Sequence, residues 1–172
     1  MTFTITTDSL TLYACDESLF NIILQGNEAL AQTLHCKVPE NWSEFGLAPM
    51  HYALTLLKED PSHQTWFAYL PIHTADNMLI GSGGYKGKPQ NGIVEIGYEI
   101  IPAYRGRGLA TQMAKALIQR AFAEENVHTV MAHTLGEENA SGSILKKCGM
   151  HFVRELFDPG DGKIWAWKLE KG

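Results

Sequence analysis

The chain has 172 residues, of which 45% are hydrophobic and 19% are charged. These values are ordinary for a soluble globular protein, and they argue against disorder. The length suits one compact domain over residues 1–172 with a sizeable core. The formal net charge of −5 argues against a nucleic-acid partner, because such proteins usually carry a basic excess or a basic patch.

The sequence also argues against a membrane protein and a secreted one. Its apolar stretches are much shorter than the roughly 20 residues that a helix needs to cross a bilayer. Residues 1–8 have no basic start and no apolar block, so no signal peptide is expected. Cys15, Cys36 and Cys148 lie far apart and form no CxxC pair, which disfavours a disulfide framework and a zinc site. We therefore expect a cytoplasmic protein without a metal ion.

The first part of the chain predicts one strand followed by helices. Residues 9–15 alternate apolar and polar side chains as a strand does. Asp16 is suited to cap the helix that follows, because its side chain can accept a hydrogen bond from the first turn. Two further helices are predicted over residues 28–35 and 49–59.

The second part predicts an antiparallel meander and then alternating helices and strands. Three strands are expected at residues 64–72, 77–86 and 93–101, because turns rich in Gly, Asn, Pro and Asp separate them. A long amphipathic helix, a strand, a short helix and a last strand then follow, at residues 110–123, 128–134, 141–148 and 163–169. This order predicts an α/β fold with a mixed, mostly antiparallel sheet of about six to seven strands flanked by helices.

The segment between the third meander strand and the long helix carries the chemistry. It reads R-G-R-G-L-A-T at residues 105–111. The first turn of a helix leaves backbone N–H groups unpaired at the positive end of the helix dipole. Glycines allow that backbone to approach a ligand closely, and Arg105 and Arg107 add positive charge. The segment is therefore a candidate phosphate or pyrophosphate site.

Two well-known phosphate loops do not match the chain. A P-loop needs an upstream glycine that the pair Gly87-Lys88 lacks, and Pro89 follows that pair. A dinucleotide-binding fingerprint needs a third glycine where Thr111 stands. Both mismatches disfavour a nucleotide-binding α/β domain.

The match that remains is Arg-x-x-Gly-x-Ala, at residues 105–110. It resembles the pyrophosphate-binding motif of the GNAT superfamily of N-acetyltransferases. Residues 93–101 resemble that family's fourth strand, residues 110–123 the helix after it, and residues 130–134 its fifth strand. The resemblance implies a single-domain GNAT-like fold.

A second stretch, residues 139–150, resembles the family segment Asn-x-x-Ser…Leu-x-Lys-x-Gly-Phe. That form is typical of the branch that contains the bacterial ribosomal-protein (Rim-type) acetyltransferases. Ser141 stands at the family's serine, whereas Asn139 lies one place late and Met150 replaces the phenylalanine. The resemblance covers residues 9–169.

The resemblance implies that acetyl-CoA is the co-substrate. It implies phosphate contacts from Arg105, Gly106, Arg107, Gly108, Leu109, Ala110 and Thr111. It also implies that the backbone of Ile100 and Ile101 pairs with the pantetheine amides like an added strand. Asn139 is the candidate contact of the pantetheine arm.

Acetyl transfer to an amine requires a base, since side-chain amines have pKa values near 10 and α-amines near 8. Glu95 is the first candidate, because it lies on the strand that leads into the loop. Glu99 shares its face by strand alternation and is an alternative. His133, at the end of the next strand, could also accept the proton. A solvated strand carboxylate and a hydrogen-bonded pocket histidine are the structural alternatives.

The leaving thiolate requires a proton donor, and Ser141 is the candidate. Its alternative role is to cap the helix before Gly149. Tyr98 and Tyr104 are other candidate donors. Cys148 is interpreted as a buried, unreactive thiol rather than a nucleophile.

The sequence therefore predicts an enzyme that transfers the acetyl group of acetyl-CoA to a primary amine, on a protein N-terminus or a small molecule, by direct attack on the thioester. The alternative is an inactive acyl-CoA-binding module that acts as a sensor or scaffold; Glu95 and Ser141 favour the enzyme, because a pure binder needs neither. The oligomeric state, monomer or homodimer, stays open. Candidate residues of the acceptor pocket are Trp42, Phe45, Met50, His51, Trp66 and Tyr85.

Overall fold

The computed structural model describes residues 3–44 and 46–172. Within them nine strands form one sheet, in the order β1-β2-β3-β5-β6-β7-β9-β8, with β4 paired to β3. The strands are β1 (Thr4–Thr6), β2 (Leu10–Ala14), β3 (Ala68–His73), β4 (Met78–Leu79), β5 (Gly81–Tyr85), β6 (Ile93–Ile100), β7 (Thr129–Leu135), β8 (His151–Asp158) and β9 (Gly162–Glu170).

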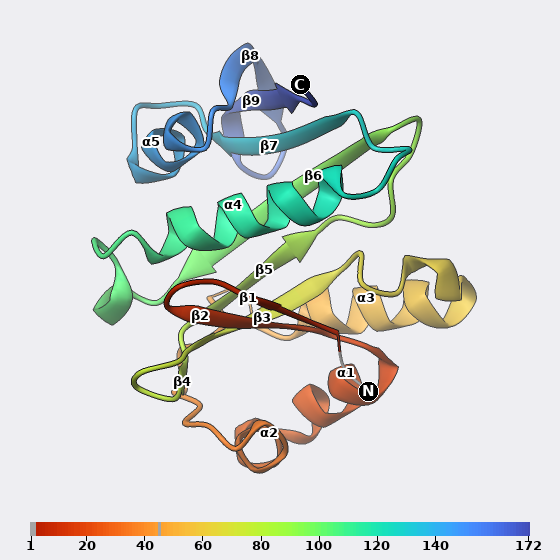
Figure 1. Cartoon of the computed structure of the whole chain (residues 1–172), viewed down its shortest axis with the longest axis vertical. Coiled ribbons are helices and arrows are strands. Elements are labelled where there is room, and N and C mark those ends of the chain that lie inside the picture. Colours follow the sequence, from red (N-terminus) through yellow and green to blue (C-terminus); the bar gives the residue numbers. More distant parts are fainter. Residues whose placement is uncertain (1–2, 45) are drawn as a thin grey trace.

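Helices cover both faces of the sheet (Figure 1). On one face lie α4 (Leu109–Phe122) and α5 (Ala140–Lys147), and on the other lie α1 (Glu17–Gln25), α2 (Asn27–Leu34) and α3 (Ala48–Glu59). Two single-turn 3-10 helices are η1 (Pro61–His63) and η2 (Pro102–Tyr104). Each face has its own core, because alternate residues of β3 point to opposite sides: Tyr69 packs with α4, and Leu70 packs with α1 to α3.

The relation between β6 and β7 positions the site. These two strands pair in parallel, and α4 connects them, whereas the other strand pairs are antiparallel. The parallel register runs from Ile93↔Thr129 to Glu95↔Met131. Both strands continue beyond it, to Ile100 and Leu135. The carboxyl halves of β6 and β7 therefore separate, and α4 begins beside the opening.

The predicted fold class is confirmed: the chain has one mixed, mostly antiparallel sheet flanked by helices. The predicted cap of the first helix is also confirmed, since Asp16 Oδ1 accepts a hydrogen bond from the Leu19 N–H at 2.8 Å. The sheet is larger than predicted, because β1 and β8 were not expected. Strand β1 is only three residues long, and β8 is exposed along most of its length, so neither shows a clear apolar alternation.

Two predicted strands have different bounds. The strand expected at residues 64–72 begins only at Ala68, because η1 and a left-handed turn at Thr65 (φ 68°) precede it. The strand expected at residues 77–86 is divided into β4 and β5. Among the described residues, no helix is both long and apolar enough to span a membrane.

Candidate active site

The loop before α4 has an open backbone at two glycines. Gly106 and Gly108 have φ values of 77° and 75°, and apart from the adjacent residues no heavy atom lies within 4 Å of the position that a Cβ would take at either residue. Gly108 is the N-cap of α4 and provides no side-chain cap. The N–H groups of the first turn, Leu109 to Thr111, therefore point to the helix end without an intrahelical acceptor. This geometry favours an anion.

Two arginines alternate with these glycines, and both are exposed. Arg105 Nε donates to the Ile100 carbonyl at 2.7 Å. Arg107 donates to the Ala103 carbonyl at 3.3 Å, and its guanidinium lies 4.7 Å from the centre of the Tyr104 ring. Each arginine thus uses only part of its five donors within the chain. The others can reach a phosphate at the start of α4.

The backbone of β6 offers hydrogen-bonding groups to the opening. Lys86 N–H donates to the Glu95 carbonyl, and Ile101 N–H donates to the Ile80 carbonyl, so the odd-numbered residues of this stretch face β5. Because the direction of the backbone groups alternates along a strand, the backbone N–H and carbonyl of Tyr98 and the N–H of Ile100 face the opening. The Ile100 carbonyl also points there but is bonded to Arg105. Of the two residues expected to pair with pantetheine, Ile101 therefore directs its N–H away from the opening.

Glu95 lies where β6 and β7 separate. Its Oε2 atom is 3.1 Å from Nδ1 of His133, and it is also in contact with Nζ of Lys86. The Oε2 atom is buried, and neither contact has good hydrogen-bond geometry. About a quarter of each of the Glu95 and His133 side chains is exposed. The structure thus brings two of the three candidate bases together.

The third candidate, Glu99, lies four residues further along β6. Its Oε1 atom accepts hydrogen bonds from the Glu44 N–H and the Ser82 hydroxyl, both at 3.0 Å. Its Oε2 atom is buried and has no hydrogen-bond partner among the described residues. Burial raises the pKa of Glu99. The side chain borders a cavity of about 390 Å³, lined by residues 41–44, residues 99–102 and Arg105.

Asn139, and not Ser141, caps α5. Asn139 Oδ1 accepts a hydrogen bond from the Gly142 N–H at 3.0 Å, so the alternative role of Ser141 as the cap is wrong. The Ser141 carbonyl accepts a hydrogen bond from the Tyr98 hydroxyl at 3.3 Å, which links β6 to α5. Burial raises the pKa of the Tyr98 hydroxyl, so this group stays protonated. Two candidate proton donors, Ser141 and Tyr98, thus lie in neighbouring positions.

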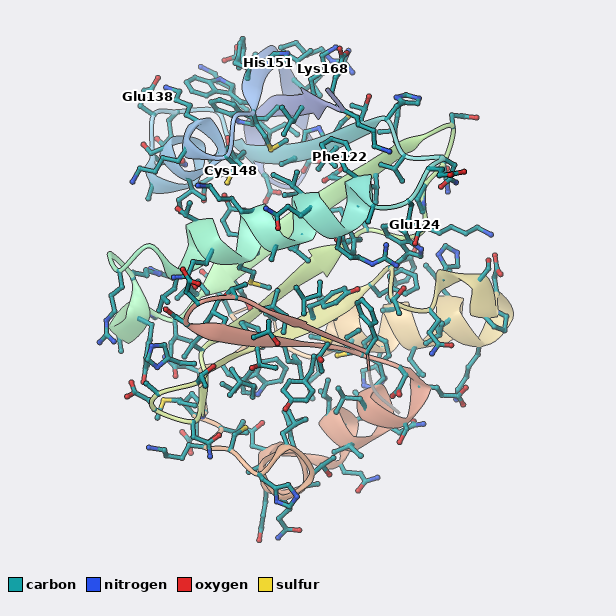
Figure 2. The ribbon with its side chains drawn as sticks, viewed as in Figure 1. Phe122, Glu124, Glu138, Cys148, His151 and Lys168 are labelled. Carbon is teal, nitrogen blue, oxygen red and sulfur yellow. The ribbon has the colours of Figure 1, made fainter. Side chains whose placement is uncertain are left out.

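Two other candidates are engaged elsewhere. The Tyr104 hydroxyl donates to Asp76 at 2.7 Å. Cys148 lies between α5 and α4 (Figure 2), with its Sγ atom 4.0 Å from the Thr111 carbonyl. Burial raises the pKa of the Cys148 thiol, which agrees with an unreactive side chain. The other two cysteines, Cys15 and Cys36, are also free thiols with pKa values that burial raises.

The candidate acceptor residues do not form one pocket. Trp42 lies on the wall of the cavity beside Glu99, and its indole N–H donates to Asn27. His51 is exposed on α3. Three of the others are buried in the two cores: Met50, Trp66 and Tyr85. Phe45 lies outside the described residues.

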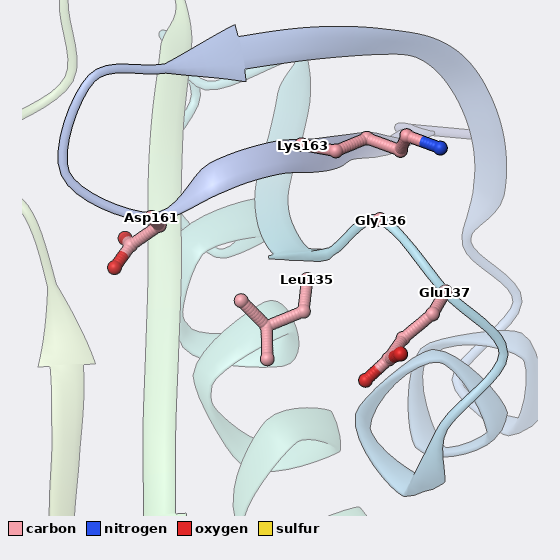
Figure 3. A pocket seen from close by; sticks show the side chains of 5 residues that line it. All are labelled: Leu135, Gly136, Glu137, Asp161 and Lys163. Atoms are coloured by element: carbon pink, nitrogen blue, oxygen red, sulfur yellow. The ribbon is translucent and has the colours of Figure 1, made fainter.

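A second cavity, of about 290 Å³, lies at the carboxyl end of β7. It is lined by Leu135, Gly136, Glu137, Asp161 and Lys163, and Figure 3 shows Asp161 and Glu137 on opposite sides of Leu135. Leu135 follows His133 by two residues in the same strand, so the two side chains share a face of the sheet. The side chain of Lys163 points to the opposite face, because Ile164 and not Lys163 pairs with Leu135. The cavity therefore lies at the end of the strands, two residues beyond His133.

Sequence reasoning missed Lys86, which follows β5 directly. The antiparallel register places Tyr85 opposite Ile96, and hence Lys86 opposite Glu95. A hairpin register counted from the turn between residues 86 and 93 could have found this contact.

Comparison with known proteins agrees with this geometry. The model of the acetyltransferase (GNAT) domain matches residues 16–151, so the chain belongs to the GNAT family of acetyltransferases. A match to the uncharacterized N-acetyltransferase YnaD of Bacillus subtilis has 36% identity over 56 residues, and it spans only 33% of either chain. The uncharacterized N-acetyltransferase YjdG of the same organism is 23% identical over 146 residues, which cover 83% of this chain and 86% of YjdG.

Solved structures support the fold. RimL, a ribosomal L7/L12 alpha-N-protein acetyltransferase whose structure holds coenzyme A, superposes with a TM-score of 0.67 at 18% sequence identity, and the match covers 98% of both chains. The predicted likeness to the Rim-type acetyltransferases therefore extends over the whole fold.

Proposed function

We propose that this chain transfers the acetyl group of acetyl-CoA to a primary amine, with Glu95 as the base. The observation that carries the proposal is the position of Glu95 at the point where β6 and β7 separate, on the strand that leads into the loop of Gly106 and Gly108. A base on β6 and an anion site in the loop that follows this strand are suited to acetyl transfer from a phosphate-bearing thioester.

The loop residues match the phosphates of acetyl-CoA. The open positions at Gly106 and Gly108 leave room for a pyrophosphate against the backbone. The first-turn N–H groups of α4 and the exposed guanidinium groups of Arg105 and Arg107 provide donors. The Tyr98 carbonyl and N–H, together with the Ile100 N–H, can pair with the pantetheine amides. Asn139 has its amide nitrogen free to take part, and its oxygen already accepts one hydrogen bond as the cap of α5.

Bound acetyl-CoA supplies an activated acetyl group as a thioester. Glu95 takes the proton of the incoming ammonium group, directly or through a water molecule, and the neutral amine attacks the thioester carbon. His133 orients the Glu95 carboxylate, since its Nδ1 atom lies 3.1 Å from Oε2. The attacking nitrogen loses its second proton to solvent as the amide forms. Ser141 donates a proton to the departing sulfur and regains one from solvent, and the Tyr98 hydroxyl beside it is the alternative donor.

The acceptor is a primary amine on a protein N-terminus or a small molecule. The cavity at the end of β7, two residues beyond His133, supports this class, because it is lined by the carboxylates of Glu137 and Asp161 against one cation, Lys163. These carboxylates would attract a cationic amine. The likeness to RimL, which is named as an α-N-protein acetyltransferase, supports the same class.

The test is a thiol-release screen with acetyl-CoA against amines, polyamines, antibiotics and peptides with free N-termini. We expect release with at least one class of primary amine, and loss of release in Glu95→Gln. Glu99→Gln is the matched control on the same face of β6. CoA binding without release with any amine would instead support an acyl-CoA-binding module.

A further inference from the structure

A lysine of the chain already lies against the proposed base. Lys86 follows β5, and its N–H donates to the Glu95 carbonyl at 3.0 Å. Residues directly opposite each other in an antiparallel pair share a face of the sheet. The Lys86 ammonium accordingly contacts Glu95 Oε2. A primary amine from the chain itself therefore occupies a position from which Glu95 can take a proton.

We propose that Lys86 is a self-acetylation site: in the presence of acetyl-CoA the chain acetylates its own Lys86 Nζ. This inference rests on the proposed function, because it uses the same base and the same acetyl donor. The Lys86 side chain is 64% exposed, so its four-carbon stem is free to move between Glu95 and the opening between β6 and β7.

The reaction is balanced without a further co-reactant. Glu95 takes one proton from the Lys86 ammonium, and the neutral nitrogen forms a bond to the acetyl carbon. The bond between that carbon and sulfur breaks, and the sulfur leaves with its electron pair. The nitrogen, which is positively charged once the new bond has formed, loses its second proton to solvent. Ser141 or solvent protonates the thiolate, and a proton given by Ser141 is replaced from solvent. The products are an acetyl amide on Lys86 and free CoA.

Lys88 shows why this inference concerns one lysine in particular. It lies two residues further along the same segment, but its Nζ atom is held by Asp60 Oδ2 and Ser62 Oγ, both at 2.7 Å. These groups lie on the loop around η1 and do not belong to the site. Lys88 is 38% exposed against 64% for Lys86, so it also meets free acetyl-CoA, but it lacks the contact with the base. It is therefore the internal control on the same segment.

Acetylation would alter the site. It converts the Lys86 ammonium into a neutral amide and removes the positive charge next to Glu95. Of the two charged or titratable contacts described for the Glu95 carboxylate, the one with His133 would remain. Self-acetylation therefore also offers a way for acetyl-CoA to modify the base environment while no acceptor amine is present.

The experiment incubates the full chain with acetyl-CoA and no acceptor, and follows acetylation of each lysine by peptide mass spectrometry. We expect Lys86 to be acetylated at least about tenfold faster than Lys88, at a first-order rate that does not change when the protein is diluted. Glu95→Gln should slow the acetylation of Lys86 by about 10²–10⁴-fold, as expected for loss of a general base, and leave the acetylation rate of Lys88 unchanged.

Gly108→Val provides a second variant, in the loop before α4, in which weaker acetyl-CoA binding should lower the Lys86 rate at a subsaturating concentration of acetyl-CoA and so reduce the preference for Lys86. Thermal unfolding verifies that each variant is folded. Equal acetylation of Lys86 and Lys88 in the wild-type chain, or an undiminished Lys86 rate in a folded Gly108→Val chain, would overturn the inference. If external amines are acetylated while Lys86 is not, only this inference fails; if neither is acetylated, the proposed function fails with it.

Discussion

Glu95 Oε2 and His133 Nδ1 lie 3.1 Å apart, although the two residues come from strands that pair only as far as Glu95. The contact crosses the opening between β6 and β7 directly after the last paired residues, Glu95 and Met131. His133 comes from the strand on the other side of the gap, so it borders the carboxylate at the point where the gap begins. His133 is thus placed to orient the proposed base.

Replacement of His133 tests this positioning role. His133→Ala should lower kcat/KM by less than Glu95→Gln does, with the KM for acetyl-CoA unchanged, because the base stays present but is held less well. His133→Asn should recover part of the loss, since its amide N–H can take the place of Nδ1–H. The measurement is steady-state kinetics of both variants with one acceptor. A loss as large as that of Glu95→Gln, with no recovery in His133→Asn, would make His133 the base.

Gly108→Val should weaken CoA binding by about tenfold or more, equivalent to about 1.4 kcal/mol. A β-branched side chain is strained at the φ of 75°, and it would project into the open space before α4. Gly162→Val is the matched control, because Gly162 has a φ of 76° and equally open surroundings at the first residue of β9. Both variants should lose stability, but only Gly108→Val should lose affinity in calorimetric titrations. Equal affinity in the two would refute the loop assignment.

Ser141→Ala should reduce turnover less than Glu95→Gln does. The thiolate of CoA is already a fair leaving group, since an ordinary thiol has a pKa of about 8.5. A higher pH should not restore the rate, because it supplies no proton to the sulfur. The pH profile of kcat/KM for Ser141→Ala records this, with Tyr98→Phe as the companion variant. A larger loss in Tyr98→Phe would transfer the donor role to Tyr98.

Glu99 should make the stability of the chain depend on pH. Burial raises its pKa in the folded state, so the folded chain holds this proton more tightly than the unfolded chain does. Protonated Glu99 contributes to the stability of the folded chain. This contribution is fully present below the ordinary glutamate pKa of about 4.3, and it is lost as the pH rises through the raised pKa of the folded state. Glu99→Gln, which mimics the neutral acid, should therefore gain stability relative to wild type as the pH rises. Urea unfolding at several pH values measures this, and a constant difference between the two proteins would contradict it.

The sequence predicts those parts of the fold that depend on residues close together in the chain. The period of apolar residues in α4 and the glycines of residues 106–108 are local signals, and the structure places both as expected. The first predicted strand and the Asp16 cap are of the same kind. Strand β8 lacks such a signal, because it is a mostly exposed edge strand whose place depends on pairing with β9.

The candidate site depends on register between strands, which a single sequence does not encode locally. Glu95 could be selected by its place on a strand, but its contact with His133 follows from the pairing of Glu95 with Met131. The contact with Lys86 follows from the pairing of β5 with β6. The role of Asn139 as the α5 cap was open to local reasoning, since asparagine is a favoured N-cap.

The most direct test of the central claim is the pH–rate profile of kcat/KM for Glu95→Gln beside wild type, with an amine that the thiol-release screen identifies. The variant should be slower by about 10²–10⁴-fold near neutral pH. Its deficit should shrink as the pH rises, because more of the amine arrives already deprotonated, and its affinity for acetyl-CoA should stay close to that of wild type. A Glu95→Gln enzyme with near-normal rates at neutral pH would contradict the account and remove Glu95 from the mechanism.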